Sequence, residues 1–190
     1  MKKNLGPLGA VYPMPVLMIA TYGEDGTVDV MNAAWGMICA ENKIALFLDE
    51  DHKTTLNILA KKAFTVSIAD KAHVDAADFY GIASGNDMPD KFARTGYTAV
   101  KSGFVDAPVI DEFPLVMECE LEQIIDSGNV YAVIGNIVNT AAEESAVGED
   151  GKVDPEKLNA LIFDTFRAGY YTVGEKAGQA WQDGMKFMDK

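Results

Sequence analysis

The sequence predicts a mainly β fold with short helices, built as an antiparallel β-barrel with helical insertions. About six segments alternate apolar and polar residues or form short apolar runs, as strands do. Connections early and late in the chain have the length of hairpin loops, whereas a wound parallel sheet would need a helix after every strand. A chain of 190 residues with 48% hydrophobic content can bury one good core. We therefore expect a single domain over residues 1–190.

The first part of the chain predicts four strands and one helix. Residues 15–36, "PVLMIATYGEDGTVDVMNAAWG", predict a strand, a tight turn at residues 23–26 and a second strand. Residues 43–50 and 64–69 predict the third and fourth strands. Between them, residues 54–62 place apolar side chains at helical spacing and end in two lysines, which suit the negative end of the helix dipole.

The middle of the chain, residues 73–96, predicts two short helices rather than a strand. The segment 73–85 is amphipathic and is expected to close at Gly85. The segment 88–96 is a shorter turn of helix that we expect to close at Gly96.

The last part of the chain predicts two long strands and a tail. Residues 114–126 and 130–144 alternate apolar and polar side chains and predict two paired antiparallel strands of the main sheet. Residues 149–158 predict a surface loop that leads into a short helix, with Pro155 in its first turn. The tail, residues 169–190, mixes aromatic residues with glycine and is expected to cover part of the barrel.

Charge and composition exclude several classes of protein. Twenty-nine acidic residues against sixteen basic ones give a net charge of −13, which repels nucleic acid. No apolar run approaches the roughly 20 residues that cross a bilayer, and the proline-broken start predicts no signal peptide. Cys39 and Cys119 lie in apolar segments without C-x-x-C spacing and are predicted to be buried free thiols in a reducing compartment. We expect a cytoplasmic protein that contacts neither membrane nor nucleic acid.

An acidic cluster followed by cationic and hydroxyl side chains marks the expected start of the helix at residues 54–62. Lys53 is unfavourable at a helix N-terminus unless an anion lies there with it. A phosphate could take the free N–H groups, a hydroxyl of Thr54 or Thr55, and Lys53. Alternatively, Asp51 caps the helix, the acidic cluster neutralises Lys53 and no ligand binds.

The turn at residues 31–36, "MNAAWG", is a candidate binding loop for a flat ligand. Ala33 and Ala34 are small enough to let a ligand approach the backbone, beside the amide of Asn32 and the indole of Trp35. Alternatively, Trp35 packs into the core and the two alanines make room for it.

Other motifs limit the chemistry. Lys91 and Arg94 lie on one short turn, where surface ion pairs are the default interpretation and anion binding requires proximity to residue 53. The chain has no dinucleotide or nucleoside-triphosphate phosphate loop. His52 and His73 are far apart in the sequence without a second ligand spaced for zinc, so we predict no metal site. No catalytic side chain is predicted.

Six segments taken in order carry a resemblance to a known family. They are "YPMPVLMIATYGEDGTVDVMNAAWGMIC", "DHKTTLNI", "KAFTVSIA", "ADFYGIASGNDMPDKFARTGYTAVKSG", "DAPVIDEFPLVMECEL" and "AGYYTVGEKAG". Together they resemble the flavin reductase-like, FMN-binding split-barrel family, and within it the flavoredoxin group. The similarity runs over residues 4–188, and the order of the segments makes it specific.

The resemblance implies a homodimeric split β-barrel that holds FMN noncovalently. It implies that Asn32 and Trp35 contact the isoalloxazine or ribityl chain, and that Phe163 lies near the cofactor. It places Thr54 and Lys91 at the phosphate. With the loop residues argued above, the candidate cofactor-binding residues are Asp29, Asn32, Ala33, Ala34, Trp35, Lys53, Thr54, Thr55, Lys91 and Phe163.

Two positions depart from the family pattern. Asp29 stands where the family has a flavin-contacting asparagine, and an ionised carboxylate cannot donate a hydrogen bond. A family histidine is absent from residues 129–131, which are Asn-Val-Tyr. Proton delivery or flavin tuning by that histidine is therefore not expected.

The expected function is that of an FMN-dependent oxidoreductase. Electrons would pass from NAD(P)H or another donor through FMN to an acceptor, which could be a redox partner protein or a small molecule. An alternative is a flavoredoxin-like electron carrier that a protein partner reduces. A further alternative, from another class, is a cofactor-free barrel that serves as a binding module.

Overall fold

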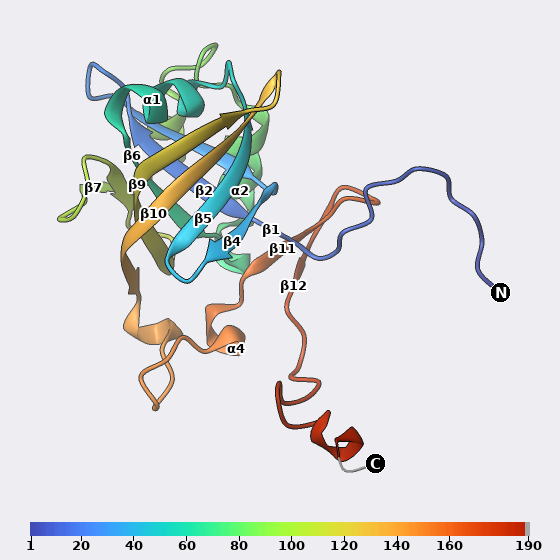
Figure 1. Cartoon of the computed structure of the whole chain (residues 1–190). Helices are drawn as coiled ribbons and strands as arrows, with labels where there is room; N and C mark the ends of the chain where they lie inside the picture. Colours follow the sequence, from blue (N-terminus) through green and yellow to red (C-terminus); the bar gives the residue numbers. More distant parts are fainter. Residues whose placement is uncertain (189–190) are drawn as a thin grey trace.

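The computed structural model describes residues 1–188 and is organised around one seven-stranded antiparallel sheet (Figure 1). Its strands are β2 (Leu17–Tyr22), β3 (Val28–Ala33), β4 (Gly36–Ala40), β5 (Lys43–Asp49), β6 (Ala63–Ile68), β9 (Leu115–Asp126) and β10 (Val130–Ala142). Their order across the sheet is β3-β2-β6-β9-β10-β5-β4. The predicted mainly β, antiparallel architecture is confirmed.

The chain passes directly from one edge of this sheet to the other. Strands β3 and β4 are the two edges, yet only Ala34 and Trp35 connect them. Such a link spans no more than about 11 Å, so the sheet has to curl until its edges meet. The result is a barrel that is split between β3 and β4 (Figure 1), and we call this junction at Ala34 and Trp35 the seam. The sequence had not predicted β4 as a separate strand.

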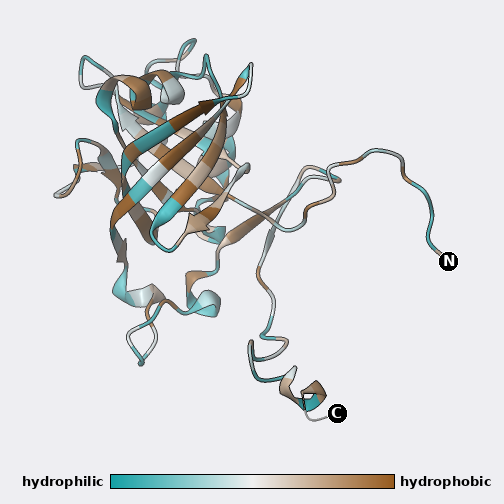
Figure 2. Cartoon of the chain, in the orientation of Figure 1, coloured by the Kyte–Doolittle hydropathy of each residue, from teal (hydrophilic) through white to brown (hydrophobic). Residues whose placement is uncertain are grey.

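Strand β2 is buried on both faces, which explains its continuous apolar run. Leu17 and Ile19 point into the barrel and pack in the core that fills it. Met18 and Ala20 point outward and pack beneath Tyr80 of helix α2 (Val74–Ile82). The hydropathy colouring shows hydrophobic stretches along the barrel strands, interrupted by hydrophilic ones, and mostly hydrophilic turns (Figure 2).

The helices match the predicted ones closely, with one difference at an end. Helix α2 stops at Ile82 rather than at Gly85, because the backbone of Ala83 is already extended. Gly96 closes its helix as predicted, in the left-handed conformation. The side chain of Asp154 accepts hydrogen bonds from the backbone N–H groups of Glu156 and Lys157. The other helices are α1 (Lys53–Lys61), α3 (Lys91–Thr95) and α4 (Pro155–Leu158), with short 3-10 turns at Lys71–His73, Glu144–Ala146 and Met185–Phe187.

Two small sheets were not predicted from the sequence. Strands β1 (Met14–Pro15), β11 (Leu161–Asp164) and β12 (Gly169–Thr172) form a three-stranded sheet, and β7 (Ala99–Lys101) pairs with β8 (Pro108–Ile110). Each of these strands has two to four residues, which is too short to show a period in the sequence.

The two ends of the chain leave the barrel instead of covering it. Figure 1 shows both terminal segments extending away from the strands. The expectation that the tail covers part of the barrel holds for its first residues, because Tyr170 packs against the core cluster outside the barrel. It is wrong for residues 173–188 of the single chain, where Trp181 is 94% exposed and Met185 is also exposed. Among residues 1–188, the structure has no helix that is long and apolar enough to cross a membrane.

Candidate functional site

A cavity of about 550 Å³ opens at the seam of the barrel. Its walls come from β3, β5, the end of α2, and the small sheet of β11 and β12. Five of the predicted residues line it, namely Asn32, Ala33, Ala34, Trp35 and Phe163. The other lining residues are Met31, Phe47, Leu48, Asp49, His52, Asp78, Gly81, Ile82, Val130 and Tyr170.

We call this the main cavity, and one of its walls is a hydrogen-bonded polar network. The side-chain amide of Asn32 donates to the carbonyl of Ala77 at 2.9 Å and to the hydroxyl of Tyr170 at 3.3 Å. Tyr170 in turn donates to the carboxylate of Asp78 at 3.0 Å. Burial and the neighbouring Asp78 raise the pKa of Tyr170, so its hydroxyl stays protonated at neutral pH. The network fixes which face of Asn32 is available to a ligand.

The opposite side of the cavity is apolar and open to solvent. Trp35 is 59% exposed, so the alternative in which it packs into the core is wrong. The turn is held by its backbone, because the N–H of Phe47 donates to the carbonyl of Trp35 at 2.8 Å. Phe47 and Ile82 are also exposed at this mouth. Exposed aromatic side chains around a cavity are typical of a site that takes a flat ligand.

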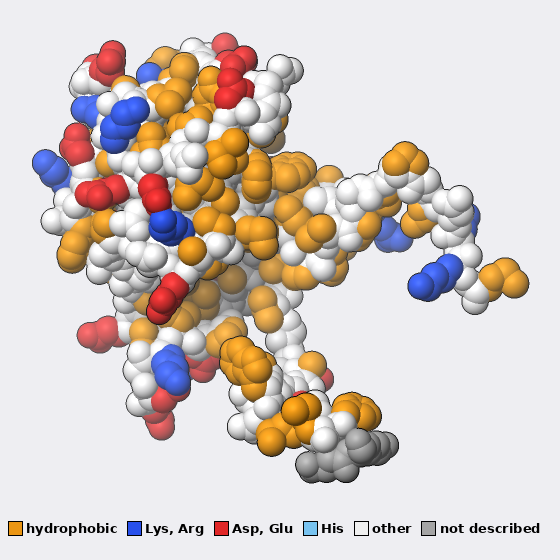
Figure 3. All heavy atoms as spheres, viewed as in Figure 1, with side chains coloured by type: hydrophobic (Ala, Val, Ile, Leu, Met, Phe, Trp, Pro, Cys, Tyr) orange, Lys and Arg blue, Asp and Glu red, His pale blue; other side chains and the backbone are white. Residues whose placement is uncertain are grey.

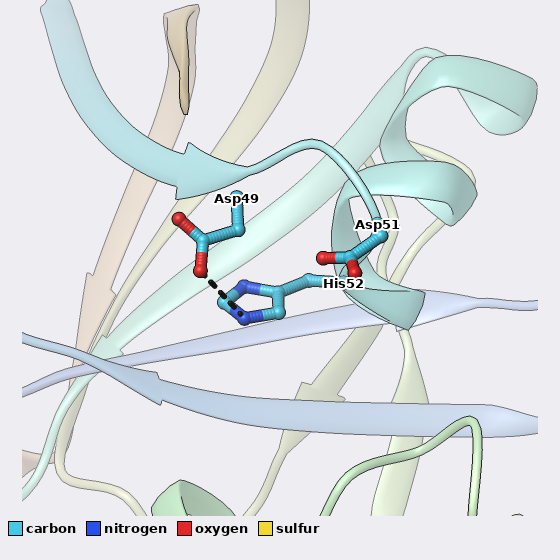
Figure 4. Close-up of side chains that lie close together, drawn as sticks. All are labelled: Asp49, Asp51 and His52. Atoms are coloured by element: carbon cyan, nitrogen blue, oxygen red, sulfur yellow. Dashed lines mark ion pairs between the residues drawn. The ribbon is translucent and has the colours of Figure 1, made fainter. Parts of the chain in front are cut away.

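His52 lies in the cavity wall at the start of α1, beside two carboxylates (Figure 4). Its Nε2 atom is 3.5 Å from Oδ2 of Asp49, and its buried Nδ1 has no hydrogen-bond partner. Possible ligand atoms of Asp49, Asp51 and His52 lie within 4.8 Å of one another, a proximity that the sequence did not predict. Both carboxylates are exposed, and acidic side chains are favourable near a helix N-terminus without a metal. The cluster by itself therefore defines no metal site.

A second cavity, of about 260 Å³, lies where β3 begins and α1 starts. Two predicted residues, Asp29 and Lys53, line it together with Gly85 and Asn86. Asn86 ties its loop to α1 by donating to the carbonyl of Asp51 at 2.9 Å. We call this the small cavity. The linings of the two cavities are adjacent in the sequence, because His52 lines the main cavity and Lys53 lines the small one.

Of the residues predicted to hold a phosphate, Lys53 lines the small cavity, whereas Thr54, Thr55 and Lys91 contact other groups of the chain. Lys91 is 2% exposed, and its ammonium group lies 3.0 Å from Oδ1 of Asp29. The Thr54 hydroxyl donates to Oδ2 of Asp29 at 2.5 Å. The Thr55 hydroxyl donates to the carbonyl of Asp49 at 2.8 Å. Phosphate binding by these side chains remains a prediction.

The structure also tests part of the alternative interpretation of the start of α1, in which Asp51 caps the helix. The residue that precedes the helix is His52, and no side chain caps the first turn, so Asp51 does not cap it. Arg94 pairs with Asp90 at 3.0 Å on the surface, which confirms the default interpretation for that residue. Lys91 is instead buried.

Sequence reasoning missed several side chains in the main cavity, above all His52, Asp78 and Tyr170. Asn32 and Tyr170 are 138 residues apart in the chain, and their contact depends on the packing of β12 against α2 and β3. His52 was noticed only as a possible zinc ligand. Its position just before the predicted helix was the signal available in the sequence.

The barrel split at its seam, with an apolar cavity along the split, defines a class of protein. Residues 8–168 match the family model described as the flavin reductase like domain, and the chain belongs to this family. The fold is therefore that of proteins with flavin-related redox functions.

Among solved structures, the chain is similar to the flavoredoxin of Desulfovibrio vulgaris (Miyazaki F), with 38% identity over 97% of this chain and 100% of that one, and a TM-score of 0.92. A flavoredoxin from Methanosarcina acetivorans is 24% identical over 99% of this chain and 100% of that one, with a TM-score of 0.90. An FMN-binding protein from Thermus thermophilus is 19% identical over 94% and 98% of the two chains, with a TM-score of 0.77. The last two show the shared fold.

Proposed function

We propose that this chain is an FMN-dependent oxidoreductase that binds FMN noncovalently and passes electrons from NAD(P)H or another donor to an acceptor. The observation that carries the proposal is the main cavity, where the residues of the "MNAAWG" turn and Phe163 lie together although they are far apart in the sequence. Family membership supports the flavin, and the name of the Thermus thermophilus relative supports FMN in particular.

The residues that are present fit a flavin. A cavity of about 550 Å³ is in the usual range for cofactor sites, and its walls are mostly apolar with few polar groups. Ala33 and Ala34 leave the backbone accessible, while Asn32 supplies a polar edge that is already oriented. When bound, FMN would supply the ability to accept a hydride and release electrons. The protein's own contribution is binding, orientation and the local field.

Two groups in the main cavity can hold protons near a bound ring. The hydroxyl of Tyr170 stays protonated and is directed to Asp78, so it stabilises the wall rather than releasing a proton. The imidazole of His52 lies in the same wall, with its Nε2 atom 3.5 Å from a carboxylate oxygen of Asp49. The sequence had assigned this histidine no role beside the cofactor.

We also propose that the active unit is a homodimer in the cytoplasm. Apolar side chains surround the mouth of the main cavity and continue over β4, where Met37 and Ile38 are more than half exposed. The space-filling view shows hydrophobic side chains gathered on the barrel where the N-terminal arm leaves it (Figure 3). A second copy would cover this face and leave a groove for a nicotinamide. The free thiols Cys39 and Cys119 suit a reducing compartment.

The test is a visible absorption spectrum of the purified protein, repeated after NADH or NADPH is added without oxygen. A yellow protein, or one that turns yellow on adding FMN, and rapid bleaching by a nicotinamide are expected. If dithionite or a partner protein bleaches the bound flavin and neither nicotinamide does, the reductase proposal fails in favour of an electron carrier. If the protein takes up no FMN at all, the cofactor-free binding module is the better account.

A further inference from the structure

We infer that Asp29 sets the specificity of this site for the form of the flavin. Its carboxylate holds Lys91 and opposes the flavin's phosphate, so that riboflavin, which lacks the phosphate, binds about as tightly as FMN. This inference rests on the proposed function, because it concerns which flavin the same site takes.

The carboxylate of Asp29 is itself an anion that contacts Thr54 and Lys91. The side chain is 4% exposed, and Oδ2 accepts a hydrogen bond from the Thr54 hydroxyl at 2.5 Å. Oδ1 lies 3.0 Å from the ammonium group of Lys91 and accepts no hydrogen bond with proper geometry. Lys91 also donates to the carbonyl of Ala83 at 3.1 Å. Asp29 therefore occupies the place that an anionic ligand of Thr54 and Lys91 would take.

The side-chain hydroxyls and the buried lysine that were predicted for a phosphate are used inside the chain. Thr54 has one O–H, which it gives to Asp29, and Thr55 gives its own to the carbonyl of Asp49. The charge of Lys91 is balanced by Asp29 at close range in a buried position. Of the predicted phosphate-binding cations, Lys53 is the one that lines the small cavity.

The side chains that line the small cavity carry no excess positive charge for a phosphate. Its charged lining residues are Asp25, Asp29 and Lys53, and the charge of Asp29 is balanced by the buried Lys91 beside it. A phosphate monoester carries a charge of about −1.5 to −2 at pH 7. Lys53 attracts it, but Asp25 in the same lining offsets that attraction. These side chains therefore offer the phosphate space without a net attraction.

Asp29 is also held in place by its neighbours. A Cβ atom added to Gly85 would lie 2.3 Å from Oδ1 of Asp29, so the glycine backbone packs directly on the carboxylate. Turning Asp29 away would leave the buried ammonium group of Lys91 without its counter-ion, which is strongly unfavourable. A phosphate therefore meets Asp29 in place and does not replace it at low free energy.

The test compares two ligands that differ only in the phosphate. FMN and riboflavin are titrated into cofactor-free full-length protein and Asp29→Asn, with flavin fluorescence reporting the dissociation constants. Asp29→Asn keeps an oxygen for Thr54 and frees the charge of Lys91. We expect wild-type protein to prefer FMN less than about tenfold, and the variant to raise this preference at least about tenfold. Asp150→Asn, an exposed carboxylate in the loop before α4, is the control for overall charge and leaves the preference unchanged.

Each outcome decides one claim. If the ion pair of Asp29 and Lys91 only holds α3 against β3, Asp29→Asn changes the dissociation constants of FMN and riboflavin by the same factor. The ratio of the two constants then stays unchanged, which overturns the inference. If Asp29→Asn does not fold, the wild-type ratio decides, since a preference for FMN above about 100-fold contradicts an opposing carboxylate. If neither flavin binds wild-type protein, the proposed function fails, and the inference fails with it.

Discussion

Asn32 shows how one side chain can shape both the stability and the binding surface of the site. Its amide donates to Ala77 and Tyr170, which joins the edge strand β3 to α2 and β12. Asn32→Asp keeps the size but loses both donors and introduces a charge near Asp78. We expect the free energy of unfolding to fall by about 1–3 kcal/mol. Urea unfolding of the cofactor-free protein measures it.

The matched control for this change is Asn42→Asp. Asn42 also donates from its side chain, to Asn136, but this hydrogen bond is exposed to water. We expect its effect to stay within about 0.5 kcal/mol. Equal effects of the two substitutions would contradict the structural role assigned to Asn32.

The two cysteines should differ sharply in reactivity. Cys119 is fully buried in the barrel core, and this burial raises the pKa of its thiol to about 12 from the usual 9. Cys39 is exposed on the edge strand β4, so the prediction that it is buried is wrong. At pH 8 a thiol reagent should modify Cys39 in the native protein and reach Cys119 only in denaturant. Mass spectrometry of the labelled peptides checks this, and native labelling of Cys119 would contradict the buried position.

At the scale of single elements, strand β10 needs a glycine at one position because an aromatic ring packs directly against its backbone. A Cβ atom added to Gly135 would lie 2.4 Å from Cζ of Phe64, which is fully buried in the barrel. Gly135→Ala should therefore lower the free energy of unfolding by about 1–3 kcal/mol through overpacking. Gly103→Ala, where no atom lies within 4 Å of the added carbon, is the control. Similar melting temperatures for both variants would refute this packing argument.

The sequence predicted the long elements well, because each carries its own period. Strands β9 and β10 alternate along a dozen residues, and β5 and β6 are short apolar runs between turn signals. The small strands β11 and β12 were missed because they exist only through pairing with each other and with β1. Helix α2 ends before Gly85 for a tertiary reason, since that glycine is needed against Asp29 rather than as a cap.

The candidate site was predicted where the local sequence is unusual. Trp35 between small residues and a glycine stood out, and it does line the main cavity. Asp78 and Tyr170 look ordinary in the sequence and gain their place only from the packing of α2 and β12. The ion pair of Asp29 and Lys91 was invisible for the same reason, because its partners lie on different elements. Long-range packing is thus what the sequence alone could not supply.

At the scale of the whole molecule, the exposed apolar face predicts self-association. Ile38 on β4 is 53% exposed and follows Trp35 of the main cavity by three residues. If a second copy covers this face, Ile38→Glu places a charge in the contact and should convert a dimer to a monomer. Light scattering after size-exclusion chromatography measures the mass. Val100→Glu, at a site on β7 that is 48% exposed, is the control and should leave the dimer intact.

Ligand binding at the seam should change how readily the barrel opens locally. Because β3 and β4 are both edge strands, the barrel is not closed by hydrogen bonds there, and the two-residue link at Ala34 and Trp35 is what joins its halves. A molecule held in the main cavity would touch β3 on one side of that gap, the link itself, and β5, the strand next to β4. A ligand that binds the closed seam then stabilises it against local opening. We therefore expect the backbone amides of the edge strands to exchange their hydrogens more slowly as the ligand fills the main cavity.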